Sequence, residues 1–468
     1  MPKSYYFLLK KSSQITLAVI FLILPFLFVS AAKAQAPNDP KYALQAPYLQ
    51  QINAPGAWGY TTGTKSVVVA VTDTGVDIDH PDLENNIWTN TKEIPNNSVD
   101  DDRNGYVDDV YGWNFVEDNN DVTLSAIKQS DDSQAVVHGT VLAGLIGAVG
   151  NNGIDGTGVN WNVKIMPLRV MDSSGNGALI SVAKAVDYAV ANGAGIISLS
   201  IIGDVNDSVF EQSLKNAYKK GVLIVSAAGN DRLFGDGDLS KNKHYPICAD
   251  SGDLDNWILG VTAVDLKDKL SDFADYGSCV DLSAPGEGIF STELLSPANG
   301  YTKEFDGAWY GTSFSAPLAA GAAALVKSIR PDWDAKEIIA DLLSTADDID
   351  GLNPQFIGQL GYGRLNVGRA VAKAVVSRII KPPLKWDVYS GGLIFVNLKK
   401  KKLTLETVDF KGNKQPLWSA NGVTDVSAVR VGNYWKSGEQ VLIKATQNKQ
   451  LVQFVVDLES KSWMRDVE

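Results

Sequence analysis

The stretch VVVAVTDTGVD, residues 67–77, decides the fold because it joins a buried strand to two carboxylates. A continuous run of β-branched apolar residues is typical of a strand that is covered on both faces, as in a parallel sheet. The run ends at Asp73, and Asp77 follows four residues later. A buried carboxylate is costly unless it is hydrogen-bonded or paired. The stretch therefore predicts a metal ligand, a ribose-binding group or a catalytic group at Asp73.

Between Lys65 and about Ala374, apolar strand-like runs alternate with helical patterns such as Ala178–Ala191. The predicted strands are Ser66–Val71, Val163–Val170, Gly195–Leu199, Val222–Ala227 and Trp257–Ala263. This alternation predicts an α/β fold, a doubly wound parallel sheet flanked by helices. In such sheets functional groups lie at the carboxyl ends of the strands, where Asp73 is expected.

The first 34 residues have the pattern of a signal peptide. Lysines 3, 10 and 11 precede an apolar run, Ile15–Ala32, and Ala32-Lys33-Ala34 forms a small-x-small cleavage site. An uncleaved membrane anchor is the alternative, because the run is near spanning length, but Pro25 and the cleavage site favour removal. We predict a signal peptide at 1–34, an N-terminal extension at 35–64 and the α/β domain at 65–376.

The Pro382-Pro383 pair marks a change of pattern near the C-terminus. We predict a linker at 377–383 and a small all-β domain at 384–468, which has short alternating runs at Leu393–Leu398, Lys402–Phe410, Val441–Ala445 and Leu451–Leu458. The two halves of this domain are faintly similar, but two units are too few for a propeller. Its sequence indicates no particular partner.

Charge and cysteine content limit the classes of function. The formal net charge is −12, and residues 35–380 alone carry −21, which disfavours nucleic acid and suits bound cations. No segment after residue 34 is long and apolar enough to span a membrane. Cys248 and Cys279 could form one disulfide in an exported protein, or be two unrelated buried thiols; their spacing does not decide.

Only three histidines are available for acid–base chemistry. His138 opens the segment HGTVLAGLIGAV, so we expect it at the start of an apolar helix, with Gly139 allowing a close backbone approach. His80 lies in a turn-like segment and His244 in a polar loop. We interpret both as ordinary surface or hydrogen-bonded histidines.

The segment YGTSFSAPLAAGAAALV, residues 310–326, predicts a tightly buried helix of small residues that begins near Ser313. Pro317 falls near its first turns, where a missing N–H costs least. A serine is a nucleophile only when a neighbouring base takes its proton. A helix cap is the alternative role for Ser313, but it does not explain the flanking Gly311-Thr312.

From about Asp39 to Val376 the chain resembles the subtilisin-like serine proteases, or subtilases. The resemblance rests on DTGVD (73–77), HPDL (80–83), HGT (138–140), SAAGN (226–230) and GTSFSAP (311–317), in that order. It implies a subtilisin-like fold and a triad in which Asp73 orients His138, His138 is the general base and Ser313 is the nucleophile.

By the same resemblance, Asn230 and the Ser313 backbone N–H stabilise the oxyanion. A simple turn residue after Gly229 is the alternative for Asn230. The family usually has a second histidine at the position of Val141, which lies outside the triad.

The resemblance also implies that peptide substrates bind as an extended strand between two edge segments. One edge contains Gly175 and Gly177, and the other contains Ser200 and Ile202. The family usually has Ser-Leu-Gly where this chain has Ser200-Ile201-Ile202. Either Ile202 replaces the glycine, or one residue is inserted before Gly203. If Ile202 crowds the pocket, we expect a preference for small residues before the cleaved bond.

Two acidic segments indicate calcium as a structural cofactor. Residues 100–108 follow the first nine positions of a calcium loop, with Gly105 at the sharp turn and the candidate ligands Asp100, Asp102, Asn104, Tyr106 and Asp108. The twelfth position is Tyr111 rather than Glu, so this is not a complete EF-hand, and a solvated acidic loop is the alternative. The resemblance implies a second site at Asp82 and Asn152.

Together these patterns predict a monomeric serine endopeptidase, secreted to the extracellular space or the periplasm, that acts on proteins or peptides. After signal removal we expect no membrane partner. A catalytically idle peptide-binding or scaffolding protein on the same fold is the alternative, and Ile202 is its best support. A dinucleotide-binding enzyme is disfavoured because the spaced glycines are missing, and an α/β-hydrolase because no Gly-x-Ser-x-Gly surrounds Ser313.

Overall fold

The computed structural model describes residues 36–123, 133–253, 255–378, 385–389, 392–399, 401–409, 414–432, 440–447, 450–457 and 463–467. Contacts divide the chain into two compact units, Ala34–Ala374 and the part that begins at Val375. The predicted signal peptide and residues 379–383 of the predicted linker lie outside the described residues. No described helix is long and apolar enough to cross a membrane.

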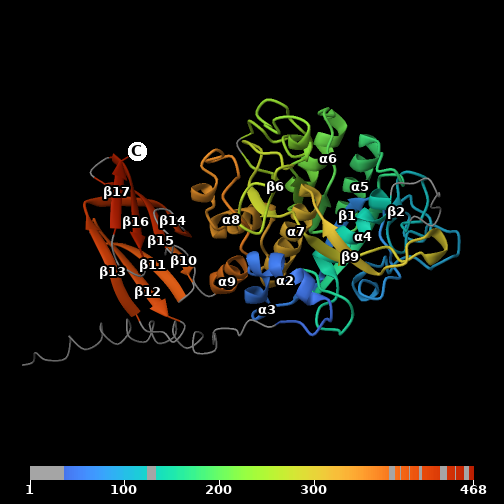
Figure 1. Ribbon diagram of the computed structural model, residues 1–468, viewed down its shortest axis with the longest axis horizontal. Helices are drawn as coiled ribbons and strands as arrows, with labels where there is room; N and C mark the ends of the chain where they lie inside the picture. Colours follow the sequence, from blue (N-terminus) through green and yellow to red (C-terminus); the bar gives the residue numbers. More distant parts are fainter. Residues whose placement is uncertain are drawn as a thin grey trace, which may run out of the picture. The chain divides into compact units, whose positions relative to one another are not determined.

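The first unit is built on a seven-stranded parallel sheet (Figure 1). In spatial order its strands are β2 (Trp113–Asn114), β3 (Asn162–Arg169), β1 (Gly63–Asp73), β4 (Ile196–Leu199), β5 (Leu223–Ala227), β6 (Ile258–Val264) and β7 (Leu282–Pro285). Strand β1 pairs with β3 on one side and β4 on the other. The strand order therefore reverses beside β1, and Asp73 lies at the carboxyl end of that strand.

Helices cover both faces of this sheet, and the alternation of side chains along β1 explains why. Val69 and Val71 belong to one buried cluster with residues of α4 (Ser133–Gly147), α7 (Thr312–Ile329), α8 (Ala335–Thr345) and α9 (Val367–Ser377). Ala70 belongs to a second cluster with residues of α5 (Leu179–Ala191) and α6 (Ser208–Lys219). The predicted doubly wound fold is confirmed.

The five predicted strands of this sheet correspond to β1, β3, β4, β5 and β6. The sequence missed β2 and β7, which have two and four residues and are too short to show a period. Helix α4 begins at Ser133, so His138 lies in its second turn rather than at its start. Because the first turn contains the polar residues Ser133 and Gln134, the apolar pattern did not indicate it.

Residues 42–58, inside the predicted N-terminal extension, form α2 (Tyr42–Gln51) and α3 (Ala54–Trp58). Leu49 and Trp58 are buried in the same cluster as α4 and α7. A two-stranded hairpin of β8 (Ile289–Thr292) and β9 (Phe305–Trp309) precedes α7. Short 3-10 turns are η2 (Glu84–Asn86), η3 (Asp231–Leu233), η4 (Pro297–Asn299) and η5 (Asp350–Leu352).

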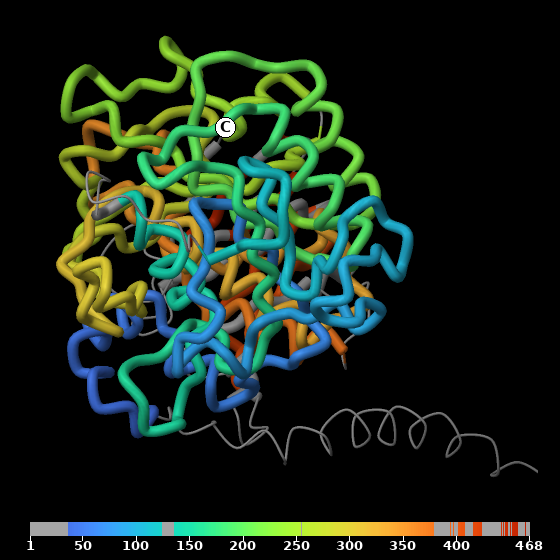
Figure 2. The backbone as a smooth tube through the Cα atoms, turned by 90° about the vertical axis from the view of Figure 1, so that its right-hand side faces the viewer, coloured from blue at the N-terminus to red at the C-terminus, as the bar shows by residue number. Residues whose placement is uncertain are grey.

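The acidic segment around residue 100 forms a loop at the periphery of this unit, next to β2 (Figure 1 and Figure 2). It contains no helix or strand between residues 90 and 112. Its backbone therefore depends on side-chain hydrogen bonds.

The C-terminal unit is all-β, as predicted. One antiparallel sheet contains β10 (Lys385–Tyr389), β11 (Gly392–Lys399), β12 (Lys402–Asp409) and β13 (Lys414–Asn421). The other contains β14 (Val423–Gly432), β15 (Gln440–Gln447), β16 (Gln450–Asp457) and β17 (Trp463–Val467). Alternate residues such as Ile394, Val396, Ile443 and Phe454 form one buried core between the two sheets.

Candidate active site

Asp73 and His138 form a hydrogen-bonded pair at the carboxyl end of β1. Asp73 is 1% exposed, and its Oδ1 accepts the Nδ1–H of His138 at 2.8 Å. The same oxygen accepts the backbone N–H of Thr74 at 2.8 Å and its hydroxyl at 3.2 Å. These three donors share Oδ1 of the carboxylate expected at the end of the buried strand, while Oδ2 is buried without a hydrogen bond among the described residues. With Nδ1 donating, the Nε2 of a neutral ring carries the lone pair.

Gly139 explains how α4 reaches β1. A Cβ atom at this position would lie 2.1 Å from the carbonyl oxygen of Gly75 and 3.2 Å from Asp73 Oδ1. Any side chain would push the helix away from the loop that follows β1. The glycine beside the histidine therefore permits the close approach that the sequence predicted.

The pKa of His138 is raised above its ordinary value of about 6.5. Burial by itself lowers it, but the negative charge and the hydrogen bond of Asp73 outweigh that effect. The imidazolium that forms when this ring accepts a proton is thus stabilised by Asp73. The ring is a stronger base than a free imidazole.

Ser313 lies in the first turn of α7 and lines one cavity with His138. This cavity has a volume of about 310 Å³, and its wall includes Asn230, Trp309 and Phe314. Backbone N–H groups in the first turn of a helix have no intrahelical partner, so they favour developing negative charge. The first turn of α7 therefore brings the hydroxyl and backbone N–H groups to the same cavity.

Asn230 follows β5 and is fixed by α7. Its Oδ1 accepts the backbone N–H of Thr312 at 2.9 Å and the Thr312 hydroxyl at 3.2 Å. The N–H of Gly229 in turn donates to Thr312 Oγ1 at 3.0 Å. Because the amide oxygen is engaged in this way, the NH₂ group is the part of the side chain that remains for the cavity.

Ser200, which is predicted to contact substrate, has a buried side chain that supports the nucleophile segment. Its hydroxyl donates to the carbonyl oxygen of Ser313 at 2.9 Å. That carbonyl would normally accept an N–H from residue 317, but Pro317 has none. Ser200 thus satisfies an acceptor that the proline leaves free, and it holds the first turn of α7.

The other predicted substrate-binding residues lie on exposed segments. Gly175, with φ of +79°, and Gly177 belong to the turn after β3. A Cβ atom at Gly177 would lie 2.4 Å from the carbonyl oxygen of Val170, so this turn needs a glycine there. The side chain of Ile202 is 43% exposed and is not part of the wall of the 310 Å³ cavity.

The loop of residues 100–108 surrounds a compact group of carboxylates. Asp100 and Asp102 each bring one oxygen within 4.8 Å of the other and of Glu93. Glu93 is buried, and its Oε2 has no hydrogen-bond partner among the described residues. A buried carboxylate oxygen without a donor fits a cation, and calcium takes oxygen ligands of this kind. Sequence reasoning missed Glu93 because it lies seven residues before the loop.

Other predicted ligands of this loop have different partners. The carboxylate of Asp108 accepts the backbone N–H groups of Asn97 and Ser98, outside the group of carboxylates. Its role as a ligand stays a prediction, because the carboxylate of Asp100 also accepts two backbone N–H groups. Asn104 Oδ1 accepts the N–H of Tyr106, whose ring packs against Trp113. An acidic loop with internal hydrogen bonds has the same sequence pattern as a ligand set.

Asp82 and Asn152 lie together, as the resemblance implied. The Asn152 side-chain amide donates to Asp82 Oδ1 at 2.7 Å, and Asp82 Oδ2 is buried without a hydrogen bond. Burial raises the pKa of Asp82 to about 7, and the negative charge of Asp39 adds to the effect. Asp39 accepts the backbone N–H groups of residues 151–153. These residues fit a cation, and Asp39 was missed because it is 43 residues from Asp82.

The structure also places the two cysteines and the other two histidines. Cys248 and Cys279 form a disulfide, with Cα atoms 5.1 Å apart. His80 is buried and hydrogen-bonded, because its Nδ1 accepts the N–H of Asp82 and its Nε2 is 2.6 Å from the carbonyl oxygen of Glu304. His244 is buried among carboxylates rather than at the surface.

Comparisons with known proteins agree with this geometry. The model of the subtilase family matches residues 64–363. Thermitase from Thermoactinomyces vulgaris is 33% identical over 335 residues, which are 72% of this chain and 99% of thermitase. The halolysin-like extracellular serine protease Nep from Natrialba magadii is 32% identical over 72% of this chain and 53% of that protein.

A solved structure of a protease from Pseudoalteromonas arctica PAMC 21717 is also similar. Its sequence is 29% identical, its TM-score is 0.56, and the alignment covers 73% of this chain and 100% of the solved chain. The fold and the matches define a serine peptidase. The chain belongs to the subtilase family.

Proposed function

We propose that this protein is a secreted serine endopeptidase that cleaves proteins or peptides through an acyl-enzyme. The observation that carries the proposal is the 2.8 Å bond from His138 to buried Asp73, with His138 and Ser313 on the wall of one cavity. We assign the activity to the predicted catalytic domain, residues 65–376, and expect a monomer.

The reaction follows from the roles of these groups. Ser313 Oγ attacks the carbonyl carbon of the scissile bond, and its proton passes to Nε2 of His138. Asp73 holds the ring and stabilises the imidazolium. The negative charge on the substrate oxygen is stabilised by the Asn230 NH₂ group and the Ser313 N–H.

The tetrahedral intermediate then collapses. The C–N bond breaks, and His138 returns its proton to the leaving amine. A water molecule, deprotonated by His138, next attacks the acyl ester in the same way. The Ser313 hydroxyl is restored when the C–O bond of the ester breaks.

Calcium is proposed as a structural ion. Glu93, Asp100 and Asp102 would hold one ion, and Asp82 with Asn152 a second, because each site contains a buried carboxylate oxygen without a donor. The ions would neutralise these carboxylates and link loops that contain no regular structure.

Secretion is supported by three independent features. The N-terminus has the pattern of a signal peptide. The Cys248–Cys279 disulfide suits an oxidising compartment. The relative from Natrialba magadii is described as extracellular. Sequencing the N-terminus of the exported protein tests the predicted cleavage after Ala34.

The test of the activity is Ser313→Ala, assayed on casein. We expect turnover to fall by about a millionfold, the size of the loss for the nucleophile of subtilisin, a member of the same family. The matched control is Ser315→Ala on the same helix, since the Ser315 hydroxyl donates to Ala284 and Pro285 carbonyls. Full activity of the Ser313 variant would exclude this nucleophile.

The idle peptide-binding alternative makes a different prediction. It expects peptides to bind the wild-type protein and remain intact over hours in calcium-containing buffer. Cleavage by the wild type, lost in Ser313→Ala and retained in Ser315→Ala, excludes it.

A further inference from the structure

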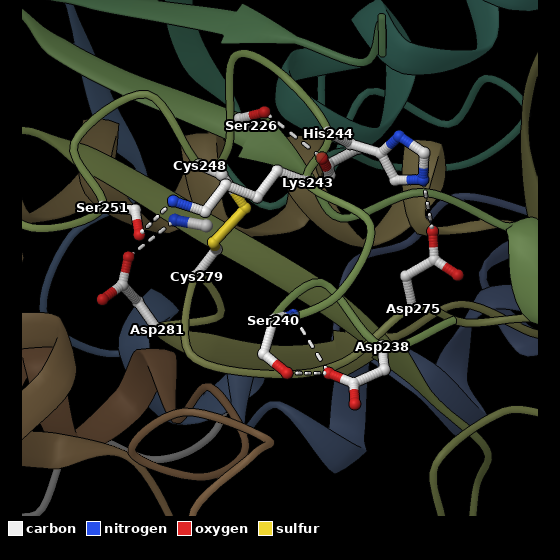
Figure 3. The surroundings of a disulfide bond; sticks show 12 residues. Ser226, Asp238, Ser240, Lys243, His244, Cys248, Ser251, Asp275, Cys279 and Asp281 are labelled. Carbon is white, nitrogen blue, oxygen red and sulfur yellow. Dashed lines mark hydrogen bonds and ion pairs between the residues drawn. A yellow bond between two sulfur atoms is a disulfide. The ribbon is translucent and has the colours of Figure 1, made fainter. Parts of the chain in front are cut away.

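A second histidine–carboxylate group lies outside the cavity that contains Ser313. It consists of Asp231 in η3, His244 in the loop before the Tyr245-Pro246 bond, and Asp275 in the loop between β6 and β7. His244 Nε2 lies 3.3 Å from Asp231 Oδ2 and 3.4 Å from Asp275 Oδ2. Figure 3 shows His244 and Asp275 facing each other.

Asp275 is the most informative member of this group. Its side chain is 0% exposed, and its Oδ2 forms no hydrogen bond among the described residues. Its Oδ1 accepts the backbone N–H of Arg232 at 3.0 Å. A fully buried carboxylate oxygen 3.4 Å from a ring nitrogen fits a cation that both atoms could bind.

The other ring nitrogen of His244 faces a third carboxylate. Nδ1 is 3.2 Å from Oδ1 of Asp204, a carboxylate that is otherwise 86% exposed. Such a contact holds the proton on Nδ1 and turns the lone pair of Nε2 toward the opposite side, as in carboxylate–histidine–metal arrangements. In His244 that side contains the two carboxylates.

The distances match a metal ion between these atoms. With metal–nitrogen and metal–oxygen bonds of about 2.0–2.2 Å, two ligands at the tetrahedral angle lie about 3.3–3.5 Å apart. Both His244 distances agree with that value. Imidazole nitrogen with two carboxylates suits zinc and its first-row neighbours, whereas calcium takes oxygen ligands.

We propose that Asp231, His244 and Asp275 bind a first-row divalent cation of the zinc class, with water as its fourth ligand. Asp231 and His244 line a cavity of about 240 Å³, which has room for that water. Asp204 positions the histidine from outside the ligand set. This site is separate from the two proposed calcium sites, which contain oxygen ligands alone.

The surrounding chain holds the three ligands in place. His244 lies four residues before Cys248, and Asp275 lies four residues before Cys279, so the disulfide joins the two loops that carry them (Figure 3). Gly229 admits the carboxylate, because a Cβ atom there would lie 2.3 Å from Asp275 Oδ2.

The third ligand, Asp231, directly follows Asn230. A bound ion would therefore connect the disulfide-linked loops to the turn that carries the proposed oxyanion donor. Its binding should stabilise that turn and raise the melting temperature by mass action.

The experiment uses the full chain with Ser313→Ala, to prevent self-cleavage, in calcium-containing buffer. Zn²⁺ is titrated by calorimetry, and Co²⁺ is followed by the visible absorption typical of four-coordinate cobalt. We expect one equivalent of each to bind and to compete with the other, while added Ca²⁺ does not displace them. We expect Asp231→Asn and His244→Gln to weaken binding more than a hundredfold, and Asp204→Asn by about 10–100-fold.

Asp236→Asn is the matched control, since this substitution removes the same charge as Asp231→Asn. Asp236 lines the same cavity but lies outside the ligand group. It should leave zinc affinity within about threefold. Asp231 and Asp204 are more than half exposed, so their variants should fold even if Asp275→Asn does not. Absence of zinc binding, equal binding by Asp231→Asn, or equal weakening by Asp236→Asn would each overturn the proposal.

Discussion

His138 is partly buried and His244 is buried, and both lie next to aspartates, yet their surroundings differ at one ring nitrogen. In each ring Nδ1 faces a carboxylate, Asp73 for His138 and Asp204 for His244. The Nδ1 of His138 is engaged by Asp73, and His138 lines a cavity that Ser313 also lines. The Nε2 of His244 instead faces Asp231 and Asp275.

This difference separates two kinds of chemistry. A neutral Nε2 beside a hydroxyl and an open cavity can take a proton from a nucleophile. A neutral Nε2 between two carboxylates is a ligand in a cation site. Under the two proposals, what faces Nε2 distinguishes the two sites, rather than the histidine–aspartate pair itself. The following predictions test this contrast.

The largest loss of activity is expected at Asp73, the aspartate that contacts His138. Asp73→Asn should lower kcat by about ten-thousandfold, because the amide no longer holds the tautomer or stabilises the imidazolium. The control is Asp281→Asn, a partly buried carboxylate that accepts the N–H of Gly260. Its kcat should stay within a few-fold, although its melting temperature falls. Steady-state kinetics on a peptide substrate measure kcat for both variants, and equal losses would contradict the assignment of Asp73.

Asn230→Ala should lower kcat by about a hundred- to thousandfold with little change in KM, the loss known for this donor in subtilisin, of the same family. Thr312→Val is the comparison, since it removes the hydroxyl contacts but keeps the backbone N–H bond to Asn230. Its loss should be at least tenfold smaller. If Thr312→Val costs as much as Asn230→Ala, Asn230 acts by positioning α7 rather than by donating to the oxyanion.

The pH profile of kcat/KM distinguishes the two rings. Because Asp73 raises the pKa of His138, the ring stays protonated to a higher pH than a free histidine. The acidic limb should therefore have its midpoint above 6.5, and activity should fall as pH decreases through that midpoint. His244→Gln should leave the midpoint in place. A midpoint below 6.5 in the wild type, or one that moves with His244→Gln, would contradict this.

A calcium chelator should act on the two proposed calcium sites, which contain oxygen ligands alone. Removing calcium from Ser313→Ala protein should lower the melting temperature by about 5 °C, if calcium was at a thousand times its dissociation constant. Asp100→Asn should reduce this shift, since Asp100 belongs to the Glu93 group. Calorimetry measures the transition. A transition unmoved by a calcium chelator would remove the structural role of calcium.

The smallest effect is expected from Ile202→Gly. If Ile202 narrows the specificity pocket, the wild type should prefer small residues before the cleaved bond. The substitution should then increase cleavage after Phe, Tyr or Leu by about tenfold at most, since the Ile202 side chain is 43% exposed. A peptide library profiled with both proteins measures this. An unchanged profile would support the inserted-residue alternative.

The sequence predicted the strand and the Asp73–His138 contact because their signals are local. The β-branched run from Val67 predicted β1, and the residues beside Asp73, His138 and Ser313 are contiguous motifs. Gly139 could be predicted as a close approach, since only a glycine fits beside the carbonyl of Gly75. The parallel sheet could be predicted because apolar strand-like runs alternate with helical patterns, and each is long enough to be recognised.

What the sequence did not predict depends on residues that meet only after folding. Glu93 joins Asp100 and Asp102, and Asp39 reaches residues 151–153, without any spacing motif. The role of Asp108 as a ligand stays a prediction, since an Asx-rich turn has the same sequence pattern as a calcium loop. Asp275 reaches His244 through the disulfide-linked loops, which no local pattern indicates.

The central claim is that Ser313, activated by His138 and Asp73, is the nucleophile of a serine peptidase. A fluorophosphonate probe tests it most directly, with the labelled peptide identified by mass spectrometry. We predict one adduct, on the peptide that contains Ser313, in the folded wild type at pH 8. The adduct should be lost in Ser313→Ala and slowed in Asp73→Asn. No labelling of the folded wild type, or labelling of a different serine that persists in Ser313→Ala, would contradict the account.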